Sequence, residues 1–371
     1  MTRLGDVATY INGFAFKPDD WSEEGLPIIR IQDLTGNSYQ MNRYAGDYNP
    51  KYEVNRGDVL ISWSASLGVY VWQGEKALLN QHIFKVIFDK CDVDKSFYVH
   101  QVAAILEKAA SQAHGATMKH LTKPVFDALP FYLPDLPTQQ RIADTLDKVS
   151  EGIGLCRKML GELDLMVKAK FQEMFGDENY PHTELINLIK DGMGLSYGIV
   201  QPGDDGTGEM GVLRPVDMVG GKISMTSIKY IDRSIGDGFR KTELTGDELL
   251  ITVRGTTGVT ALTDARFTGM NVTRGIAVIR YDREKINPVY LNAYLNTDES
   301  QRYIQEHTRG ATLQQINLSD LRIQDIVVPP INLQNRFAAF IAEVDKSKLT
   351  IQGIRDKMEM EKLALMQEYF G

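Results

Sequence analysis

The chain has few residues that could build a disulfide framework or a metal site, and it has no long apolar run. Only two of its 371 residues are cysteine, Cys91 and Cys156, and the six histidines show no metal-ligand spacing with them. We therefore expect two free thiols and no metal ion. No apolar stretch approaches the ~18 residues of a membrane span, and the first ten residues, MTRLGDVATY, lack the apolar core of a signal peptide. These absences favour a cytoplasmic protein without membrane contact.

The motifs of nucleotide and cofactor chemistry are also missing. The chain has no G-x-x-x-x-G-K-[ST] loop, which is the phosphate-binding loop of many ATPases. Two segments, Asn49-Pro50-Lys51-Tyr52 and Asn287-Pro288-Val289-Tyr290, approach the N/D-P-P-[YF] motif of amino-methyltransferases, but their third residue is wrong and no F-x-G-x-G loop precedes them. We expect a non-catalytic chain with no cofactor of its own. Its net charge of −8 means that any contact with nucleic acid must use local basic patches or the surface of a partner.

What the sequence does contain is two long amphipathic stretches, residues 138–175 and 333–370. In both, apolar residues recur mainly at steps of three and four, the heptad pattern of a coiled coil. Each stretch has 38 residues, enough for a helix about 57 Å long and longer than most helices of globular proteins. The second seam is interrupted by Lys348, Arg355 and Lys362. The predicted seam residues are Ile142, Leu146, Val149, Ile153, Cys156, Leu160, Leu163, Val167 and Phe171, and Phe337, Ile341, Val344, Ile351, Met358, Met366 and Tyr369.

The order of elements occurs twice. Before the first long helix, short β-branched or aromatic runs predict strands at 7–11, 27–32, 58–64, 67–73, 82–88 and 126–133, with a helix at 97–113 between the last two. Residues of the first half recur in the second at an offset that only grows, from 179 to 195, as expected of a duplication with lengthened loops. The matched residues are Gly13 with Gly192, Arg30 and Asp33 with Arg214 and Asp217, Gly57-Asp58 with Gly246-Asp247, Asn80 with Asn271, Gly115-Ala116-Thr117 with Gly310-Ala311-Thr312, and Gln139 with Gln334.

We therefore predict an α/β (α+β) fold of two similar mixed modules, each followed by a long helix. The modules span 1–136 and 177–331, and the helices span 137–176 and 332–371. The helices are expected to pair as an antiparallel coiled coil, with a pseudo-twofold axis relating the two halves of the chain.

With the blocks GDVLISWSASLG, LNQHIFKV, HGATMKHL and LPDLPTQQRIADTLD in this order, the chain resembles the specificity subunit of Type I restriction–modification enzymes. The resemblance implies that each module is a target recognition domain that reads one half of a split sequence in double-stranded DNA. It also implies that the helices set the spacing of the half-sites and bind two methyltransferase subunits, and that restriction subunits join the complex. S-adenosylmethionine, ATP and Mg²⁺ would then belong to the partner subunits. The acidic net charge departs from what DNA binding favours.

The alternative is a coiled-coil scaffold whose repeated modules bind protein. A fused methyltransferase is disfavoured by the missing motifs.

If the two modules read different half-sites, matched positions that are identical should be structural or contact phosphates, and matched loops that differ should contact bases. Arg30 and Arg214 are identical, and either a phosphate contact or an ion pair with Asp33 and Asp217 would suit them. Trp63 could stack on DNA or belong to the core, and Arg254 could contact guanine or lie solvated on a hairpin. The candidate DNA-binding residues are Asn12, Phe14, Lys17, Arg30, Trp63, Ser64, Ser66, Gln81, His82, Lys119, His120 and Lys123, and Tyr197, Arg214, Arg254, Thr256, Thr257, Arg274, Arg309, Gln314 and Gln315.

Overall fold

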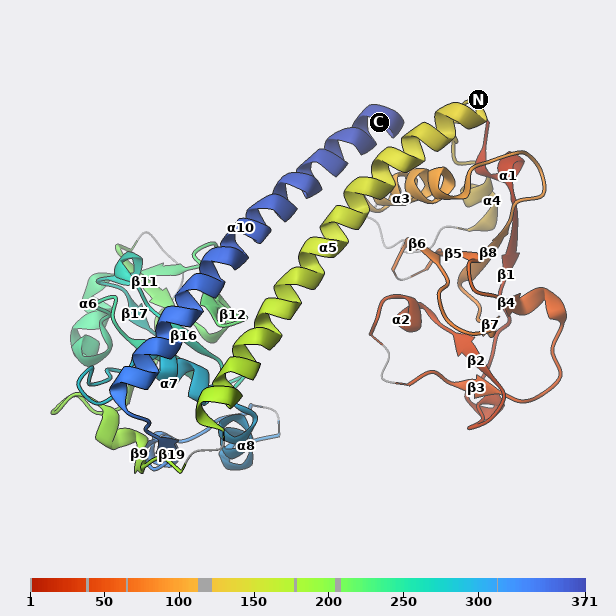
Figure 1. Cartoon of the computed structure of the whole chain (residues 1–371). Helices are drawn as coiled ribbons and strands as arrows, with labels where there is room; N and C mark the ends of the chain where they lie inside the picture. Colours follow the sequence, from red (N-terminus) through yellow and green to blue (C-terminus); the bar gives the residue numbers. More distant parts are fainter. Residues whose placement is uncertain are drawn as a thin grey trace. The chain divides into compact units, whose positions relative to one another are not determined.

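The computed structural model describes residues 2–37, 40–64, 66–112, 122–176, 179–203, 208–311 and 313–371. Two compact units are present. Unit 1 comprises Met1–Met159 with Ile351–Gly371, and unit 2 comprises Leu160–Thr350. Two helices of 40 residues each, α5 (Leu136–Phe175) and α10 (Ile331–Phe370), contribute one segment to each unit (Figure 1). None of the helices in the described part of the chain is both long and apolar enough to cross a membrane.

Unit 1 is built on a four-stranded antiparallel sheet in the order β1-β8-β5-β6. Alternate side chains of its strands point to opposite faces, so Val59, Ile61 and Phe84 pack against the helices while Leu60 and Ile83 pack against a second, smaller sheet. The first sheet contains β1 (Thr9–Asn12), β8 (Ile83–Ile87), β5 (Val59–Ser62) and β6 (Gly68–Val71). The second contains β3 (Arg43–Tyr44), β2 (Leu26–Ile29), β7 (Ala77–Leu79) and β4 (Glu53–Val54). The helices of this unit are α1 (Leu4–Val7), α2 (Ile31–Leu34), α3 (Lys95–Gln112), α4 (Lys123–Asp127), η1 (Pro18–Asp20) and η2 (Pro50–Tyr52).

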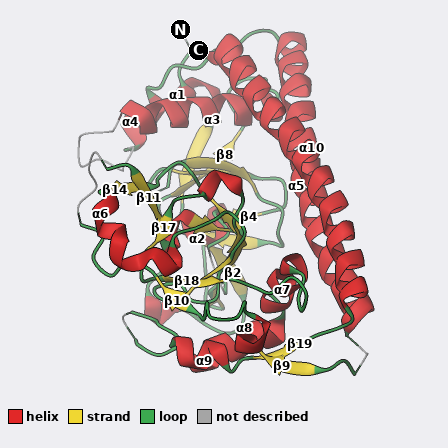
Figure 2. Ribbon diagram, turned by 90° about the vertical axis from the view of Figure 1, so that its left-hand side faces the viewer, coloured by secondary structure: helices red, strands yellow, loops and turns green. Residues whose placement is uncertain are grey.

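Unit 2 repeats this plan. Its large sheet has the order β10-β18-β15-β16, and its second sheet has the order β14-β11-β17. The strands are β10 (Ser196–Tyr197), β18 (Ile276–Ile279), β15 (Leu249–Thr252), β16 (Thr260–Leu262), β14 (Lys229–Ile231), β11 (Met210–Leu213) and β17 (Asn271–Val272), with the pairs β12 (Met218–Val219)–β13 (Lys222–Ile223) and β9 (His182–Glu184)–β19 (Asp325–Val327). The helices are η3 (Leu185–Leu188), η4 (Pro215–Asp217), α6 (Arg233–Gly236), η5 (Asp237–Thr242), η6 (Ala265–Phe267), α7 (Pro288–Leu295), α8 (Asp298–His307) and α9 (Leu318–Arg322) (Figure 2).

The register of the strands confirms the internal repeat and corrects three of its predicted matches, those of Gly13, Asn80 and the pair Gly57-Asp58. In unit 1 the backbone of Phe14 bonds to Leu79 and Gln81, and in unit 2 that of Ile199 bonds to Val272 and Arg274 in the same way. Phe14 and Ile199 are therefore equivalent, and Gly13 matches Gly198 rather than Gly192. Because a Cβ atom would lie 2.0 Å from the carbonyl oxygen of Asn80 at Gly13, and 1.8 Å from that of Val272 at Gly198, only glycine fits either position.

By the same alignment, Asn80 of unit 1 is equivalent to Thr273 of unit 2, not to Asn271. The offset is 185 at Phe14 and Ile199, and it falls to 184 where β2 and β11 pair with their parallel neighbours β7 and β17. The expectation that the offset only grows is therefore wrong at this step, since loops have changed length in both copies.

The strand predicted at 126–133 is also wrong. Residues 123–127 form α4, which has a proline in its first turn, a position that proline favours. Beyond it, Pro130 makes only an isolated bridge to Arg3, because proline has no N–H to donate to a sheet. In unit 2 the equivalent residue is Asp325, and there a strand forms. The other predicted strands of unit 1 are present, and α3 covers the predicted helix as far as residue 112.

Within each unit, the α5 and α10 segments pack side by side and run antiparallel. In unit 1, Ile142 and Leu146 share a core with Met366 and Phe370, and Arg157 pairs with Glu359 at 3.0 Å. In unit 2, the rings of Phe171 and Phe337 meet at 5.5 Å, and Lys348, which interrupts the predicted seam, pairs with Asp164 at 2.6 Å. The predicted coiled-coil pairing is therefore confirmed within both units. The pseudo-twofold axis stays a prediction.

Each module is fastened to the start of its long helix by a buried glutamine. The side-chain oxygen of Gln139 accepts from the N–H of Asp94 at 2.8 Å, and its nitrogen donates to the carbonyl of Pro134 at 2.8 Å. Gln334 makes the equivalent bonds to Asn287 and to Pro329, at 2.8 and 2.7 Å. This match was visible in the sequence, and its role is to fix the angle at which the helix leaves the module.

Candidate nucleic-acid interface

The large sheet of unit 2 ends at a basin of about 790 Å³. Four of the predicted residues, which are far apart in the sequence, line it together: Tyr197 on β10, Arg254 after β15, Arg274 before β18 and Gln315 after α8. Arg322 of α9, which was not among the predicted residues, also lines the basin. No motif or spacing marked Arg322 in the sequence, because only the fold brings α9 to this edge.

Backbone hydrogen bonds hold Arg254 from both sides. The N–H of Val253 donates to the carbonyl of Gly275 at 2.8 Å, and the N–H of Gly255 donates to that of Gln314 at 2.8 Å. Gly255 has a φ of +82°, a conformation that glycine adopts without strain. The position of Arg254 is therefore set by three different segments of the chain.

The basin is cationic. Three arginines and no carboxylate are found among its described lining residues. Arg322 donates to the carbonyl of Leu195 at 3.0 Å. Arg274 is exposed and has no ion-pair or hydrogen-bond partner for its guanidinium within the described residues. The Nε atom of Arg254 is buried, and it likewise has no acceptor among them. Unpaired N–H groups of this kind are suited to an anionic or acceptor-rich ligand.

The remaining candidates of unit 2 lie outside the basin lining. Arg309 and Gln315 exchange backbone hydrogen bonds of 2.8 Å, and the guanidinium of Arg309 lies 3.6 Å from Asp320. Thr257 is buried, and its hydroxyl forms a hydrogen bond of 2.9 Å with that of Thr308. Thr257 therefore stabilises the loop between β15 and β16. Thr256 and Gln314 are exposed.

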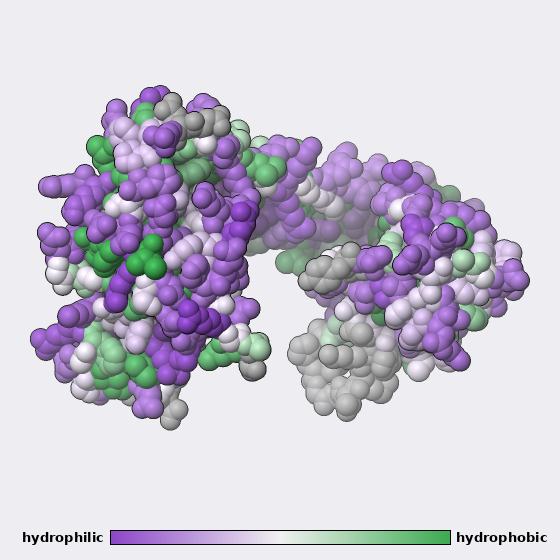
Figure 3. All heavy atoms as spheres, turned by 90° about the horizontal axis from the view of Figure 1, so that it is seen from below, coloured by the Kyte–Doolittle hydropathy of each residue, from purple (hydrophilic) through white to green (hydrophobic). Residues whose placement is uncertain are grey.

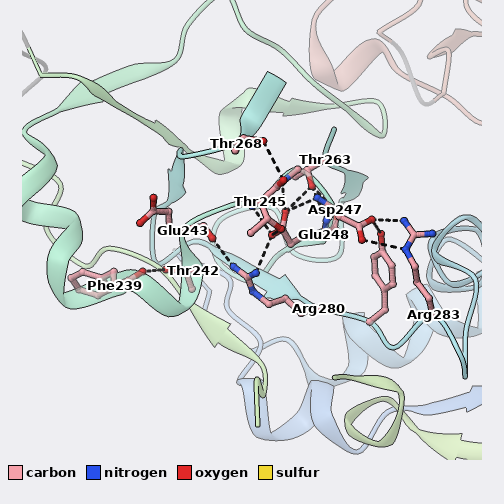
Figure 4. Close-up of polar contacts among 12 residues, drawn as sticks. Phe239, Thr242, Glu243, Thr245, Asp247, Glu248, Thr263, Thr268, Arg280 and Arg283 are labelled. Atoms are coloured by element: carbon pink, nitrogen blue, oxygen red, sulfur yellow. Dashed lines mark hydrogen bonds and ion pairs between the residues drawn. The ribbon is translucent and has the colours of Figure 1, made fainter. Parts of the chain in front are cut away.

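The strand that leads to Arg254 is anchored at its other end by buried charge (Figure 4). The carboxylate of Glu248, which is fully buried, pairs with Arg280 at 3.2 Å and accepts hydrogen bonds from the N–H of Thr245 and of Gly246. Beside it, Asp247 accepts from Arg283 and from the hydroxyl of Tyr281.

Burial alone would raise the pKa of the Asp247 carboxyl, but these hydrogen bonds outweigh it and lower the pKa. The pKa of Tyr281 is raised by burial and by its bond to Asp247. The network fixes β15 and β18, and so the backbone that carries the basin.

In unit 1, the described residues at the equivalent ends of β1, β5 and β8 are aromatic or uncharged polar residues. The indole nitrogen of Trp63 donates to the side-chain oxygen of Asn12 at 3.2 Å, and its ring stacks on Phe84 at 5.6 Å and meets His82 at 5.0 Å. Trp63 is thus half-buried against the core, as one of its two interpretations expected. His82 has a φ of 72°, and its buried Nδ1 has no described partner. Gln81 is half-buried.

The other candidates of unit 1 are distributed differently. Ser64 is buried, Ser66 is exposed, and Phe14 is exposed beside Phe16 at 4.9 Å. Lys123 pairs with Asp127 at 2.5 Å. The backbone N–H of Lys17 donates to Asp20 at 2.7 Å, and its side chain is exposed. Lys119, His120 and the Gly115-Ala116-Thr117 loop lie outside the described residues.

Arg30 and Arg214 have the ion pair that was one of their two predicted roles. In each case the backbone N–H donates to the carboxylate of the aspartate three residues later at 2.8 Å. The guanidinium Nε also donates to that carboxylate, at 3.3 Å from Arg30 to Asp33 and at 3.1 Å from Arg214 to Asp217. Both carboxylates are buried, so these identical positions cap α2 and η4. A phosphate contact by the remaining N–H groups stays a prediction.

The comparisons with known proteins identify the family. The model of the Type I restriction modification DNA specificity domain matches residues 1–164 and 217–360. The chain belongs to this family. It is 24% identical over 372 residues to the Type I restriction enzyme EcoBI specificity subunit of Escherichia coli, an alignment that covers 92% of this chain and 78% of that protein. It is 23% identical over 184 residues to the MjaVIII specificity subunit of Methanocaldococcus jannaschii, covering 49% of this chain and 43% of that protein.

Solved structures of the family share the fold. The S subunit of the Type I restriction–modification system from M. genitalium matches with a TM-score of 0.57 at 12% identity, and covers 100% of this chain and 95% of its own. A structure that concerns complex assembly and conformational transition of the type I R-M system matches with a TM-score of 0.56 at 17% identity, covering 100% and 96%. The predicted family resemblance and the predicted fold class are thereby confirmed. Among the described residues of this chain, no group of three or more His, Cys, Asp or Glu side chains is arranged to hold a metal ion.

Proposed function

We propose that this chain is the DNA-recognition subunit of a Type I restriction–modification complex, and that each unit reads one half of a two-part target in double-stranded DNA. The observation that supports this is the contrast at the end of the large sheet. The strand register is equivalent in both units, yet the counterpart of Arg254 in unit 1 is Ser64. Two domains that recognise different base sequences can share a backbone, but they need different side chains where they contact the bases.

In this proposal the chain carries no catalytic group, and methyltransferase and restriction subunits perform the chemistry with S-adenosylmethionine, ATP and Mg²⁺. Exposed apolar side chains on the long helices fit a docking role for two methyltransferase subunits. In unit 1 these include Leu155, Met159, Ile354, Met360 and Leu363, and in unit 2 they include Leu165, Met166 and Leu349. Buried apolar surface is the main driving force of stable association between proteins, and helix faces that stay apolar in the free chain support such a role.

The scaffold alternative, in which the modules bind protein, receives less support. The face of the molecule shown in Figure 3 is mostly hydrophilic, and its apolar side chains lie in small separate patches. A module that bound protein through that face would be expected to present a broader apolar area.

The proposal is tested with the full chain purified together with its methyltransferase subunits. Methylation of a random duplex library, read by sequencing, is expected to reveal a motif of two short half-sites with a fixed gap. Binding of the same complex should weaken steeply with salt, because phosphate contacts release counterions. Methylation without sequence preference would overturn the proposal.

A second test concerns the spacing role of the helices. Inserting seven residues after Met159 in α5 and after Thr350 in α10, at the boundaries of the units, keeps the heptad register. It should lengthen the preferred gap by about 10 Å, or ~3 base pairs. Insertion into α5 alone is the control, because it mismatches the pair and should abolish activity instead of shifting the gap. An unchanged gap after the double insertion would contradict this role.

A further inference from the structure

Resting on the proposed function, the structure assigns a base-reading role to one residue: we propose that Arg254 reads a guanine in the half-site contacted by unit 2. Three observations carry the proposal, namely the fixed backbone of Arg254, the unmet hydrogen-bonding capacity of its side chain, and the residue that replaces it in unit 1.

The backbone around Arg254 is fixed by hydrogen bonds on both sides of the residue. Its neighbours Val253 and Gly255 each donate a backbone hydrogen bond, to Gly275 and Gln314, and Val253 also accepts one from Ile316 at 3.0 Å. Bidentate recognition of a base requires a guanidinium held in one plane, because two parallel N–H groups must meet O6 and N7 of guanine together. The fixed backbone of Arg254 gives its side chain a fixed point of attachment from which to reach a base.

The side chain of Arg254 is left with hydrogen bonds to make. Its Nε atom is shielded from solvent and has no acceptor among the described residues. No carboxylate is found among the described residues that line the basin, so its charge is not matched there. A ligand that brings acceptor atoms into the basin would supply the partners that the guanidinium lacks among the described residues, and this favours binding.

The comparison with unit 1 separates a base contact from a phosphate contact. Phosphate contacts are independent of sequence and should be available to both units. The residue equivalent to Arg254 is Ser64, whose side chain is buried, so the contact exists in unit 2 alone. A contact that only one reader makes can distinguish the two half-sites. Arg274 differs in this respect, because its counterpart Gln81 can also bind a phosphate, and its exposed guanidinium needs no fixed plane.

The test compares wild type with Arg254→Ala, Arg254→Gln and Arg254→Lys, each as the full chain in complex with its methyltransferase subunits. The probe is a duplex library randomised in both half-sites. Arg254→Ala is expected to lose roughly 5- to 150-fold discrimination at one G·C pair of one half-site and to leave the other positions unchanged. Arg254→Gln should shift the preference at that pair towards adenine, which glutamine pairs with. Arg254→Lys should keep the charge while losing most of the discrimination.

Arg240→Ala is the matched control, since this arginine of unit 2 is 79% exposed, pairs with Asp237 and does not line the basin. It should change no base preference. Weaker binding of Arg254→Ala to all sequences alike, with a salt slope lower by about 0.9, would mean a phosphate contact and overturn the proposal. Unchanged preferences in both Arg254→Ala and Arg254→Gln would also overturn it. If the wild-type complex itself shows no sequence preference, the proposed function fails instead, and the two failures are distinguishable.

Discussion

Unit 1 and unit 2 present the same end of the same sheet with opposite chemistry. In unit 1 this edge carries Trp63, Asn12 and His82, which contact one another and carry no fixed charge. In unit 2 it carries the guanidinium groups of Arg254 and Arg274. The strand register is shared by the two units, and the side chains presented at this edge differ. Side chains at this edge of the sheet can therefore be replaced while the strand register is kept. A protein that must recognise two different half-sites requires this.

The other ends of β5 and β15 show the reverse pattern. In both units a carboxylate accepts a backbone hydrogen bond at the start of the strand, but it has more partners in unit 2. In unit 1 the carboxylate of Asp58 accepts from the N–H of Asn55 at 2.8 Å. Glu248 occupies the equivalent place in unit 2, where it accepts from Thr245 at 2.8 Å and also pairs with the half-buried Arg280. The sequence match of Asp58 with Asp247 was therefore off by one residue, because the turns place their glycines differently, at Gly57 and Gly246.

The largest effect is expected from breaking this second comparison. Glu248→Ala leaves Arg280, whose side chain is 13% exposed, without its carboxylate, and loss of one partner of a buried pair costs about 3–5 kcal/mol. Asp58→Ala removes one hydrogen bond at a half-buried site and should cost about 1 kcal/mol. Urea unfolding of the two variants, followed by circular dichroism, measures the difference. Equal losses would show that the Glu248 network adds nothing to unit 2.

The next largest loss of stability is expected from two glycine substitutions, and it should be the same in both units. Gly13→Ala and Gly198→Ala each place a methyl group within about 2 Å of a backbone oxygen, at 2.0 and 1.8 Å. The strand must move, at a cost of about 1–3 kcal/mol. Gly161→Ala is the control, because a Cβ there meets nothing within 4 Å and alanine favours a helix. Thermal unfolding should place both strand variants below wild type and the control at or above it. A tolerated Gly198→Ala would mean that the two glycines are not equivalent.

Much of the fold could be predicted from the sequence because its strongest signals are local. Heptads over 38 residues can only form a long helix that needs a partner, and runs such as 58–64 and 82–88 could be recognised as strands from their composition. The segment at 126–133 could not, since a short apolar run fits either structure, and the choice between them depended on Pro124 and Pro130.

The site was predictable in part, and for a different reason. Loops that differ between matched halves predicted Arg254, Arg274 and Gln315, the family resemblance favoured Tyr197, and the fold brings these four to one basin. Arg322 was missed because it is part of a helix that looks ordinary in sequence and reaches the basin only in three dimensions. The partners of Arg30 and Arg214 were left open, because a sequence does not show whether an aspartate three residues later is buried.

A smaller effect would sharpen the contrast at the sheet edge. Arg274→Ala removes an exposed cation of unit 2, and the slope of log binding constant against log salt should fall by about 0.9, with base preferences unchanged. Gln81→Ala, at the equivalent position of unit 1, removes no charge and should leave the slope unaltered. Titrations of the complex on its target at several salt concentrations provide both values. A lower slope for both variants, or for neither, would contradict the assignment of a phosphate contact to Arg274.

The smallest effect concerns acid. The lowered pKa of Asp247 means that the folded state binds this proton less readily than the unfolded chain. The carboxylate therefore stabilises unit 2 at neutral pH, and this contribution is lost as the pH falls below the ordinary value for aspartate, about 3.9, through the lower value in the folded state. Asp247→Asn should lower the melting temperature by a few degrees or less at pH 7, because the side chain is 39% exposed and solvent screens its pair with Arg283.

The gap between Asp247→Asn and wild type should close as the pH approaches 3. Unit 1 has a glycine, Gly57, at the equivalent position, so this position contributes no pH-dependent stability there. Asp237→Asn, which alters a carboxylate 67% exposed beside Arg240, serves as the control for a general loss of surface charge. A gap that stays constant from pH 7 to pH 3 would show that the bonds of Asp247 to Tyr281 and Arg283 do not depend on its charge, and that the two units do not differ in how they respond to acid.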